Sequence, residues 1–159
     1  MPLKLGEKAK DFELPEREGH FHSLAETVGY KLLVFYKVTC PACQLTLPFV
    51  ERLHKLYGHV VTVWGIAQDP EHAVREFAKK YGLTFPQLVD YPDYWVSVDY
   101  DVQIVPTIYL IDPGGQVDFV SHSFVKSELR ELNERLASIS GQAPEDIFAG
   151  QRVPELKPG

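Results

Sequence analysis

The apolar positions in the first half of the chain follow two different periods. Residues 32–36 are continuously apolar, which is typical of a strand buried on both faces of a sheet. A four-residue spacing then predicts a helix that begins at Pro41 and ends before Gly58, with an inner face of Leu45, Phe49, Leu53 and Tyr57. The strand is therefore expected to lead directly into a helix.

The same alternation of strand and helix occurs once more. Residues 60–66 predict a second buried strand. Asp69 and Pro70 are expected to cap the helix that follows and Gly82 to end it, with an inner face of Val74, Phe77, Ala78 and Tyr81. In such a β-α-β-α pattern the two strands are expected to be parallel and joined by a right-handed crossover.

Shorter elements are predicted before this unit. A strand at residues 12–14, a turn at 16–19 and a second apolar step at Phe21 indicate an N-terminal β-hairpin. Ser23 and Glu26 have the spacing of a capping box, which predicts a single helical turn that ends at Gly29.

The second half has strands close enough in sequence to pair as a hairpin. Residues 85–89 predict a short edge strand, and residues 90–101 form an aromatic, acidic connection. The apolar run 107–111 is separated only by a tight turn from a strand that contains Val117 and Phe119, so these two strands are expected to be antiparallel. A closing helix follows, with an inner stripe of Leu129, Leu132 and Leu136.

The end of the chain has a different composition. Residues 140–159 contain three prolines, three glycines and few apolar residues. We therefore expect residues 1–138 to form one domain and residues 139–159 to be an extended or mobile C-terminal extension.

Length, composition and charge limit the number of domains and the classes of function that the chain can have. With 159 residues, 45% of them hydrophobic, the chain can form one domain with a substantial core. A net charge of −6 argues against a basic face for nucleic acid or an anionic membrane, and no apolar run approaches the length of a membrane span. The first residues lack the apolar stretch of a secretory signal, so we expect a cytoplasmic monomer, or an extracytoplasmic one if a leader was removed.

The candidate reactive residues are the only two cysteines, Cys40 and Cys43, which lie where the first buried strand meets its helix. The second sulfur can fold back on the first across one helical turn and close a small disulfide ring. In an αβ context this pattern indicates a thioredoxin-type redox pair. Zinc is one alternative, but it needs two further ligands, and the closest histidines, His20 and His22, fall in a predicted polar turn. An unreactive buried pair is the other alternative.

The two sulfurs are expected to have different electrostatic environments at the start of the helix. Unpaired backbone N–H groups and the helix dipole favour negative charge at Cys40, so this sulfur is expected to attack as a thiolate. Cys43 lies one turn deeper and is expected to stay protonated until it resolves the mixed disulfide. In the cytoplasm a disulfide between them would be transient and catalytic.

Several separated motifs make residues 3–138 resemble the thioredoxin fold, and within it the TlpA/ResA-like, redoxin (AhpC/TSA-related) branch of thiol-disulfide oxidoreductases. Besides the cysteine pair, these motifs are the opening 6–14, Pro48, residues 85–86, residues 100–102 and residues 105–115. The resemblance implies an α/β, three-layer thioredoxin-like fold, in which helices flank a central mixed β-sheet and a β-hairpin extends the N-terminus.

The resemblance also implies parts of the site. Val105 and Pro106 match the segment that carries a cis-proline beside the cysteines in this fold, so they are expected to bind substrate together with Thr39, which precedes the first cysteine. The implied activity is disulfide exchange with protein disulfide or dithiol substrates and an unknown redox partner. Neither a permanent cofactor nor a metal is expected, and partners do not include nucleic acid or membrane.

Some positions depart from the family pattern. Thr39 stands where relatives commonly carry tryptophan, Val34 where thioredoxins have a buried acid, and Thr46 where some ResA-like proteins have a glutamate. The sequence therefore identifies no base for Cys43. Lys37 has two interpretations, a charge that holds the Cys40 thiolate or, more commonly, a solvated strand end.

Two other functions stay open. A peroxiredoxin-like peroxidase has a threonine or serine three positions before its reactive cysteine and a proline four before that. For Cys40 these positions are Lys37 and Leu33, and for Cys43 they are Cys40 and Tyr36. The peroxidase motif is thus absent. A redox-inactive binding module of the same fold is the second alternative, and the retention of both cysteines and Pro106 argues against it.

Overall fold

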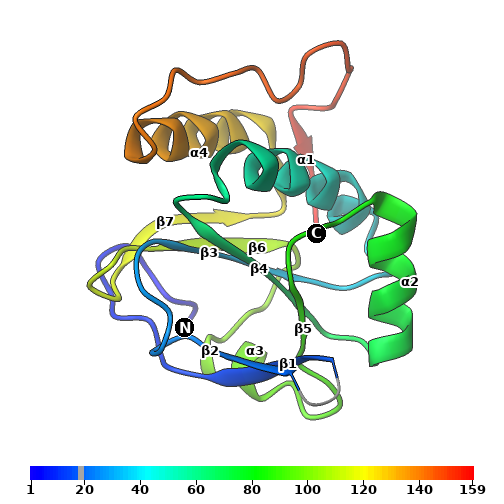
Figure 1. Cartoon of the computed structure of the whole chain (residues 1–159). Helices are drawn as coiled ribbons and strands as arrows, with labels where there is room; N and C mark the ends of the chain where they lie inside the picture. Colours follow the sequence, from blue (N-terminus) through cyan, green and yellow to red (C-terminus); the bar gives the residue numbers. More distant parts are fainter. Residues whose placement is uncertain (18–19) are drawn as a thin grey trace.

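Helices cover both faces of a central sheet in the computed structural model, which describes residues 1–17 and 20–159. Figure 1 shows α1 and α4 over one face, with α2 beside the edge strand, while α3 and the β1–β2 hairpin lie over the other face. The helices are α1 (Pro41–Tyr57), α2 (Glu71–Tyr81), α3 (Trp95–Asp99) and α4 (Lys126–Ile139). This three-layer arrangement confirms the predicted fold class.

The main sheet has the strand order β5-β4-β3-β6-β7. Its central strand β3 (Lys31–Tyr36) is parallel to β4 (Thr62–Ala67) and antiparallel to β6 (Thr107–Ile111). The parallel side ends with β5 (Gln87–Val89), and the antiparallel side ends with β7 (Val117–His122). The two expected strand pairings, parallel in the first half and antiparallel in the second, are therefore confirmed.

Every residue of β3 is buried, which explains its continuous apolar run. Alternate side chains point to opposite faces of a strand. Leu32, Val34 and Tyr36 belong to the core beneath α1 and α4, whereas Leu33 and Phe35 pack with the core that includes Phe12, Trp64 and Tyr100. Two separate hydrophobic cores thus fix the end of β3, where the cysteine helix begins.

The N-terminal hairpin consists of β1 (Glu13–Arg17) and β2 (His20–Ser23), which pair antiparallel. Of the turn predicted at 16–19, Glu16 and Arg17 belong to β1, and residues 18 and 19 lie outside the described residues. The capping-box prediction is wrong. Ser23 ends a strand, and the short turn that follows is held by Asp11, whose carboxylate accepts the Ala25 N–H at 2.9 Å.

The connection 90–101 contains α3, a helix that was not predicted from the sequence. Asp90 explains why the helix forms there, because its carboxylate accepts the N–H groups of Val96 and Ser97 and the Ser97 hydroxyl. Such side-chain acceptors satisfy the free donors at a helix start. The contact joins residues that are six and seven positions apart and needs the buried setting at the end of β5, so local periodicity carried no sign of it.

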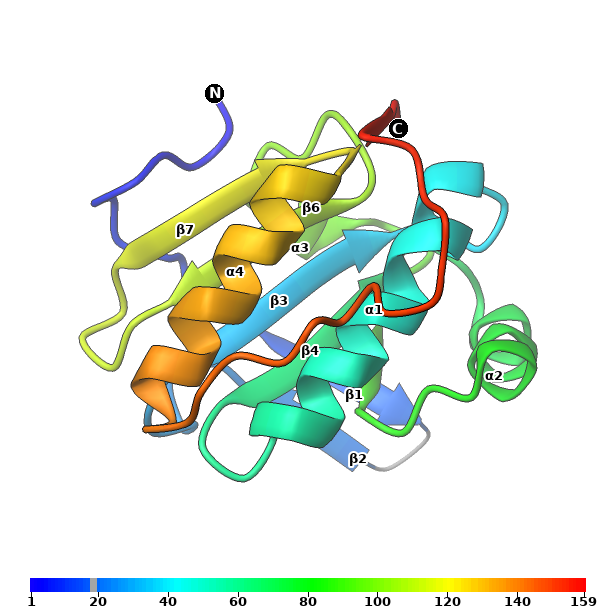
Figure 2. The same ribbon diagram turned by 90° about the horizontal axis from the view of Figure 1, so that it is seen from above.

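The chain after α4 runs in extended form over α4 and α1 (Figure 2). Ile147 and Phe148 are buried in the core beneath it, and β9 (Leu156–Lys157) pairs antiparallel with β8 (Phe124–Val125). The composition of residues 139–159 predicts an extended or mobile appendage. In the structure the middle of this segment packs into the main core, because it supplies two large apolar side chains.

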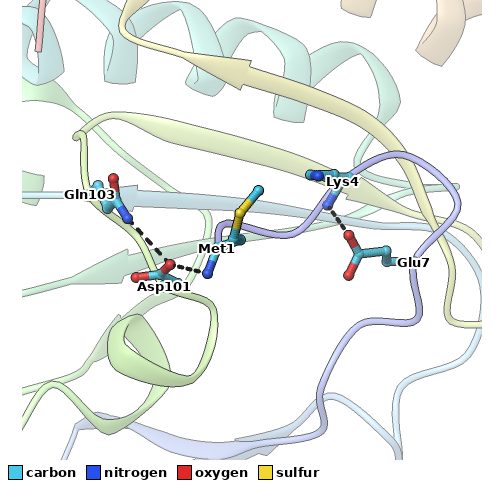
Figure 3. Close-up of polar contacts among 5 residues, drawn as sticks. All are labelled: Met1, Lys4, Glu7, Asp101 and Gln103. Atoms are coloured by element: carbon cyan, nitrogen blue, oxygen red, sulfur yellow. Dashed lines mark hydrogen bonds and ion pairs between the residues drawn. The ribbon is translucent and has the colours of Figure 1, made fainter.

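The N-terminal residues lie beside the loop that follows α3. Asp101 Oδ2 forms an ion pair with the Met1 amino group at 2.5 Å and accepts a hydrogen bond from Gln103 Nε2 at 3.3 Å (Figure 3). Glu7 Oε1 accepts the Lys4 N–H at 3.2 Å. The loop that leads to Val105 is thus supported from the N-terminal side. Among the helices of the described residues, none is both long and apolar enough to span a membrane.

Candidate active site

The cysteine pair lies at the junction between β3 and α1. Cys40 is the N-cap of α1 with an extended backbone (φ −85°, ψ 117°), and Pro41 occupies the first helical turn. The Cys43 N–H donates to Cys40 Sγ at 3.1 Å, as an N-cap side chain is expected to accept. Both thiols are free in the structure. The helix start therefore directs a backbone donor at the first sulfur, where a thiolate would benefit from it.

The two sulfurs differ in their exposure. Cys40 is half-buried, whereas Cys43 is fully buried below the first turn of α1. Burial raises the pKa of the Cys43 thiol far above its ordinary value; the neighbouring Cys40 and the charge of Asp69 raise it too, and the Lys37 backbone lowers it. The buried thiol is therefore held in its protonated form at neutral pH.

The segment before β6 lies against the first cysteine. The Val105–Pro106 peptide is cis, as predicted, and the Cys40 thiol donates to the Val105 carbonyl oxygen at 3.5 Å. Pro106 is buried, while Thr39 is exposed on the loop that precedes Cys40. The fold thus brings together residues that are 65 positions apart in sequence.

Asp69 is a site residue that sequence reasoning missed. It does not cap α2: the N-cap is Pro70, without a side-chain hydrogen bond, and Asp69 Oδ2 accepts the Val38 N–H at 2.9 Å. Gln44 Nε2 donates to the carbonyl oxygen of the same Val38 at 2.9 Å. The backbone N–H and carbonyl group of Val38 are therefore both hydrogen-bonded, and these bonds fix the loop before Cys40 between β4 and α1. In the sequence, the available sign of this role was an acidic residue two positions after the end of a buried strand.

Loss of the Asp69 contact should loosen this loop. For Asp69→Ala we expect a decrease of about 1–3 kcal/mol in the free energy of unfolding and a slower exchange reaction, because the half-buried Val38 N–H loses its acceptor. Asp69→Asn keeps an acceptor oxygen and should retain most of the stability and rate. Urea unfolding and disulfide-exchange rates of both variants test this prediction, and equal losses in both would show that the charge, not the hydrogen bond, matters.

The remaining positions singled out in the sequence have structural roles. Val34 is buried beneath α1, and the Thr46 hydroxyl donates to the Ala42 carbonyl oxygen at 2.8 Å within the helix. The Tyr36 hydroxyl donates to Gln87 Oε1 at 2.8 Å, which satisfies this fully buried side chain. Lys37 is exposed, as a solvated strand end would be.

A buried cysteine thiol and buried tyrosine hydroxyls predict how the stability of the protein depends on pH. Burial raises the pKa values of Cys43, Tyr36 and Tyr100 in the folded protein. A raised folded pKa contributes stability that is complete below the unfolded value, about 8.5 for cysteine and about 10 for tyrosine, and that is lost as pH rises above it. We expect the free energy of unfolding of the reduced protein to fall above pH ~8.5, by up to about 1.4 kcal/mol per pH unit for each group.

Chemical denaturation from pH 7 to pH 11 measures this decline, and Cys43→Ala provides the control. The variant should lose only the component that begins near pH ~8.5 and keep the steeper one above pH ~10. An unfolding free energy that stays constant up to pH 11 in the parent protein would contradict the burial of these groups.

Comparison with known proteins agrees with this geometry. Residues 5–120 match the model of the AhpC/TSA family. The chain is 33% identical to the thioredoxin-like protein YneN of Bacillus subtilis over 81% of its length and 78% of that protein. It is 32% identical to the thiol-disulfide oxidoreductase ResA of Geobacillus kaustophilus over 86% of its length and 79% of that protein.

A solved structure extends the likeness to three dimensions. It is that of a secreted Mycobacterium tuberculosis disulfide oxidoreductase homologous to Escherichia coli DsbE, with a TM-score of 0.70 at 26% identity, covering 80% of this chain and 95% of that one. Within the described residues, no group of three or more His, Cys, Asp or Glu side chains could hold a metal ion. The chain belongs to the AhpC/TSA family, and within it is a thioredoxin-like thiol-disulfide oxidoreductase.

Proposed function

We propose that Cys40 attacks disulfides of protein substrates and that Cys43 resolves the mixed disulfide. The observation that carries this assignment is the asymmetry of the pair. Cys40 is half-exposed and accepts the Cys43 N–H, whereas Cys43 is fully buried and its pKa is raised. A nucleophile has to reach its substrate as a thiolate, and a resolving thiol has to wait as a neutral group.

The reaction then proceeds in two balanced steps. The Cys40 thiolate attacks one sulfur of the substrate, the substrate S–S bond breaks, and the other substrate sulfur leaves as a thiolate that takes up a proton. Cys43 next gives up its proton and attacks Cys40 Sγ, which forms the Cys40–Cys43 disulfide and releases the second substrate thiol. Two electrons pass from the dithiol to the substrate, and the reverse sequence oxidises a dithiol.

Substrate binding is proposed at Val105, Pro106 and Thr39. Val105 places its carbonyl group beside Cys40 Sγ, and Pro106, joined to it by a cis peptide, offers no backbone N–H at that position. Thr39, which directly precedes Cys40, is exposed. A polypeptide that reaches Cys40 would therefore contact all three residues.

The activity is tested by insulin disulfide reduction with dithiothreitol as the reductant. Acceleration over buffer, and loss of that acceleration when Cys40 is replaced, supports the proposal. A rate equal to buffer would favour the redox-inactive binding module instead.

The compartment determines the direction of the reaction. We propose a monomer, either in the cytoplasm or in an extracytoplasmic compartment, with a redox partner that restores the Cys40–Cys43 pair after each exchange. Titration of the couple in glutathione buffers measures the direction, because a reductase has a potential of about −270 mV and a strong oxidant about −120 mV. A value near the second figure would show that the couple acts as an oxidant.

A further inference from the structure

The end of the chain returns to the redox site. The Lys126 N–H donates to the Glu155 carbonyl oxygen at 2.9 Å, and β9 then pairs with β8. Beyond β9, the Gly159 N–H donates to Ser123 Oγ at 3.0 Å. Residues 155–159 are called the C-terminal strap below. In Figure 2 the chain that precedes the strap crosses α1, and the C-terminus lies near the first turns of that helix.

Gly159 lies directly against the peptide that precedes Pro106. A methyl group built on Gly159 would overlap the Val105 carbonyl oxygen and lie 2.8 Å from Ile104 Cγ2. Ser123 holds both segments, because its N–H donates to the Pro106 carbonyl oxygen at 2.8 Å and its Oγ accepts the Gly159 N–H. The same Val105 carbonyl oxygen is 3.5 Å from Cys40 Sγ. The strap and the reactive sulfur therefore flank one carbonyl group.

Resting on the proposed exchange reaction, the geometry points to a strap that gates polypeptide substrates. A protein disulfide carries chain on both sides of each sulfur, and that chain has to lie beside Val105 when the sulfur reaches Cys40. A disulfide with small substituents needs only the space at the sulfur itself. The strap must leave before a protein disulfide reacts, whereas a small disulfide reacts with the strap in place.

The contacts of the strap suit it to local opening. Leu156 is 59% exposed, and Glu155, Pro158 and Gly159 are exposed as well, so few apolar contacts are lost when the strap leaves. The preceding segment is fixed separately by Ile147 and Phe148, which are buried in the core. The strap can therefore open while its anchor stays in place. A closed strap lowers the apparent affinity for a protein substrate in proportion to the fraction of open molecules.

The experiment compares the full chain with a variant that ends at Pro154. Each protein is reduced, freed of reductant and mixed with insulin or with 2-hydroxyethyl disulfide. The loss of two alkylatable thiols is then followed by mass spectrometry. If the open form is about a tenth of the population, the shortened variant should react about ten times faster with insulin and within about twofold of the full chain with 2-hydroxyethyl disulfide.

Two further measurements keep the test independent of folding problems. A synthetic peptide with the sequence 154–159 should slow the insulin reaction of the shortened variant, whereas a scrambled peptide should not. In the full chain, Gly159→Ala should accelerate the insulin reaction in the same direction as the truncation, because the new methyl group overlaps Val105. Gln151→Ala is the matched control, since Gln151 precedes the strap and its exposed side chain is removed without a change beside Val105.

The outcomes separate this inference from the proposed function. Insulin rates that stay the same or fall without the strap would overturn gating, and a fall would show that the strap helps to bind substrate. Equal acceleration with both disulfides would also overturn it, because the strap would then shield the sulfur and not the chain-binding surface. If neither disulfide oxidises any variant, the proposed exchange reaction itself is wrong.

Discussion

Cys40→Ser is expected to abolish insulin reduction down to the rate of buffer with dithiothreitol. Serine has nearly the same shape, and its hydroxyl can still accept the Cys43 N–H that Cys40 Sγ accepts at 3.1 Å, so α1 should begin at the same residue. A hydroxyl, however, does not ionise near neutral pH and does not form a disulfide. The remaining thiol, Cys43, is fully buried and protonated, so it cannot replace the nucleophile.

Cys43→Ser should give a different result with the same assay. Cys40 can still attack, but no thiol resolves the mixed disulfide, and the substrate stays attached to the enzyme. We expect multiple turnover with dithiothreitol to fall strongly. When the variant is reduced, freed of reductant and mixed with insulin, a covalent complex with insulin chains should accumulate, which non-reducing gel electrophoresis and mass spectrometry detect. The complex should disappear on addition of excess dithiothreitol.

The two variants together test the assigned roles. Covalent capture by Cys40→Ser, with none by Cys43→Ser, would reverse the roles of the two sulfurs. Iodoacetamide labelling of the unmodified protein at pH 7 provides a second measurement, and it should modify Cys40 well before the buried Cys43. Unfolding transitions of both variants should stay close to that of the reduced parent protein, which excludes misfolding as the cause of the loss.

The largest effect on stability is expected from Phe148→Ala. Phe148 is 5% exposed, and its ring centroid lies 4.8 Å from that of Phe49 and 6.5 Å from that of Phe124. It therefore fills a space between α1 and the β8–α4 segment. Truncation of a buried phenylalanine costs about 3–5 kcal/mol because apolar contacts are lost and a cavity remains. Chemical denaturation measures the change in the free energy of unfolding.

Val28→Ala is the control for this measurement, because Val28 is 92% exposed and should change stability by no more than about 0.5 kcal/mol. A similarly small effect for Phe148→Ala would mean that the segment after α4 is not part of the core in solution. A large loss would establish that this segment belongs to the folded unit, in contrast to the appendage expected from its composition.

Local sequence patterns were sufficient for the elements that carry the cysteines. The apolar run of β3, the four-residue period of α1 and the short spacing of Cys40 and Cys43 all act between near neighbours in the chain, so each can be recognised without knowledge of the fold. The cis peptide at Pro106 was predicted from a resemblance to a known fold, not from the residues alone.

Other features depend on contacts between distant parts of the chain. Asp69 was interpreted as a helix cap because Asp before a helix commonly caps it, yet its acceptor role is directed at Val38, 31 positions away. Phe148 was assigned to an extended or mobile tail because residues 140–159 contain three prolines, three glycines and few apolar residues. Composition does not show that its side chain fills a space in the core.

The sequence by itself therefore determined the redox pair, the strand and helix that present it, and the family. Only the tertiary structure decided that Phe148 is buried in the core, that Asp69 holds the loop before Cys40, and that the strap ends beside Val105. The physical reason is that periodicity reports on a single element and its own faces. The pairing of distant segments depends on shape, burial and hydrogen-bond partners that exist only after the chain has folded.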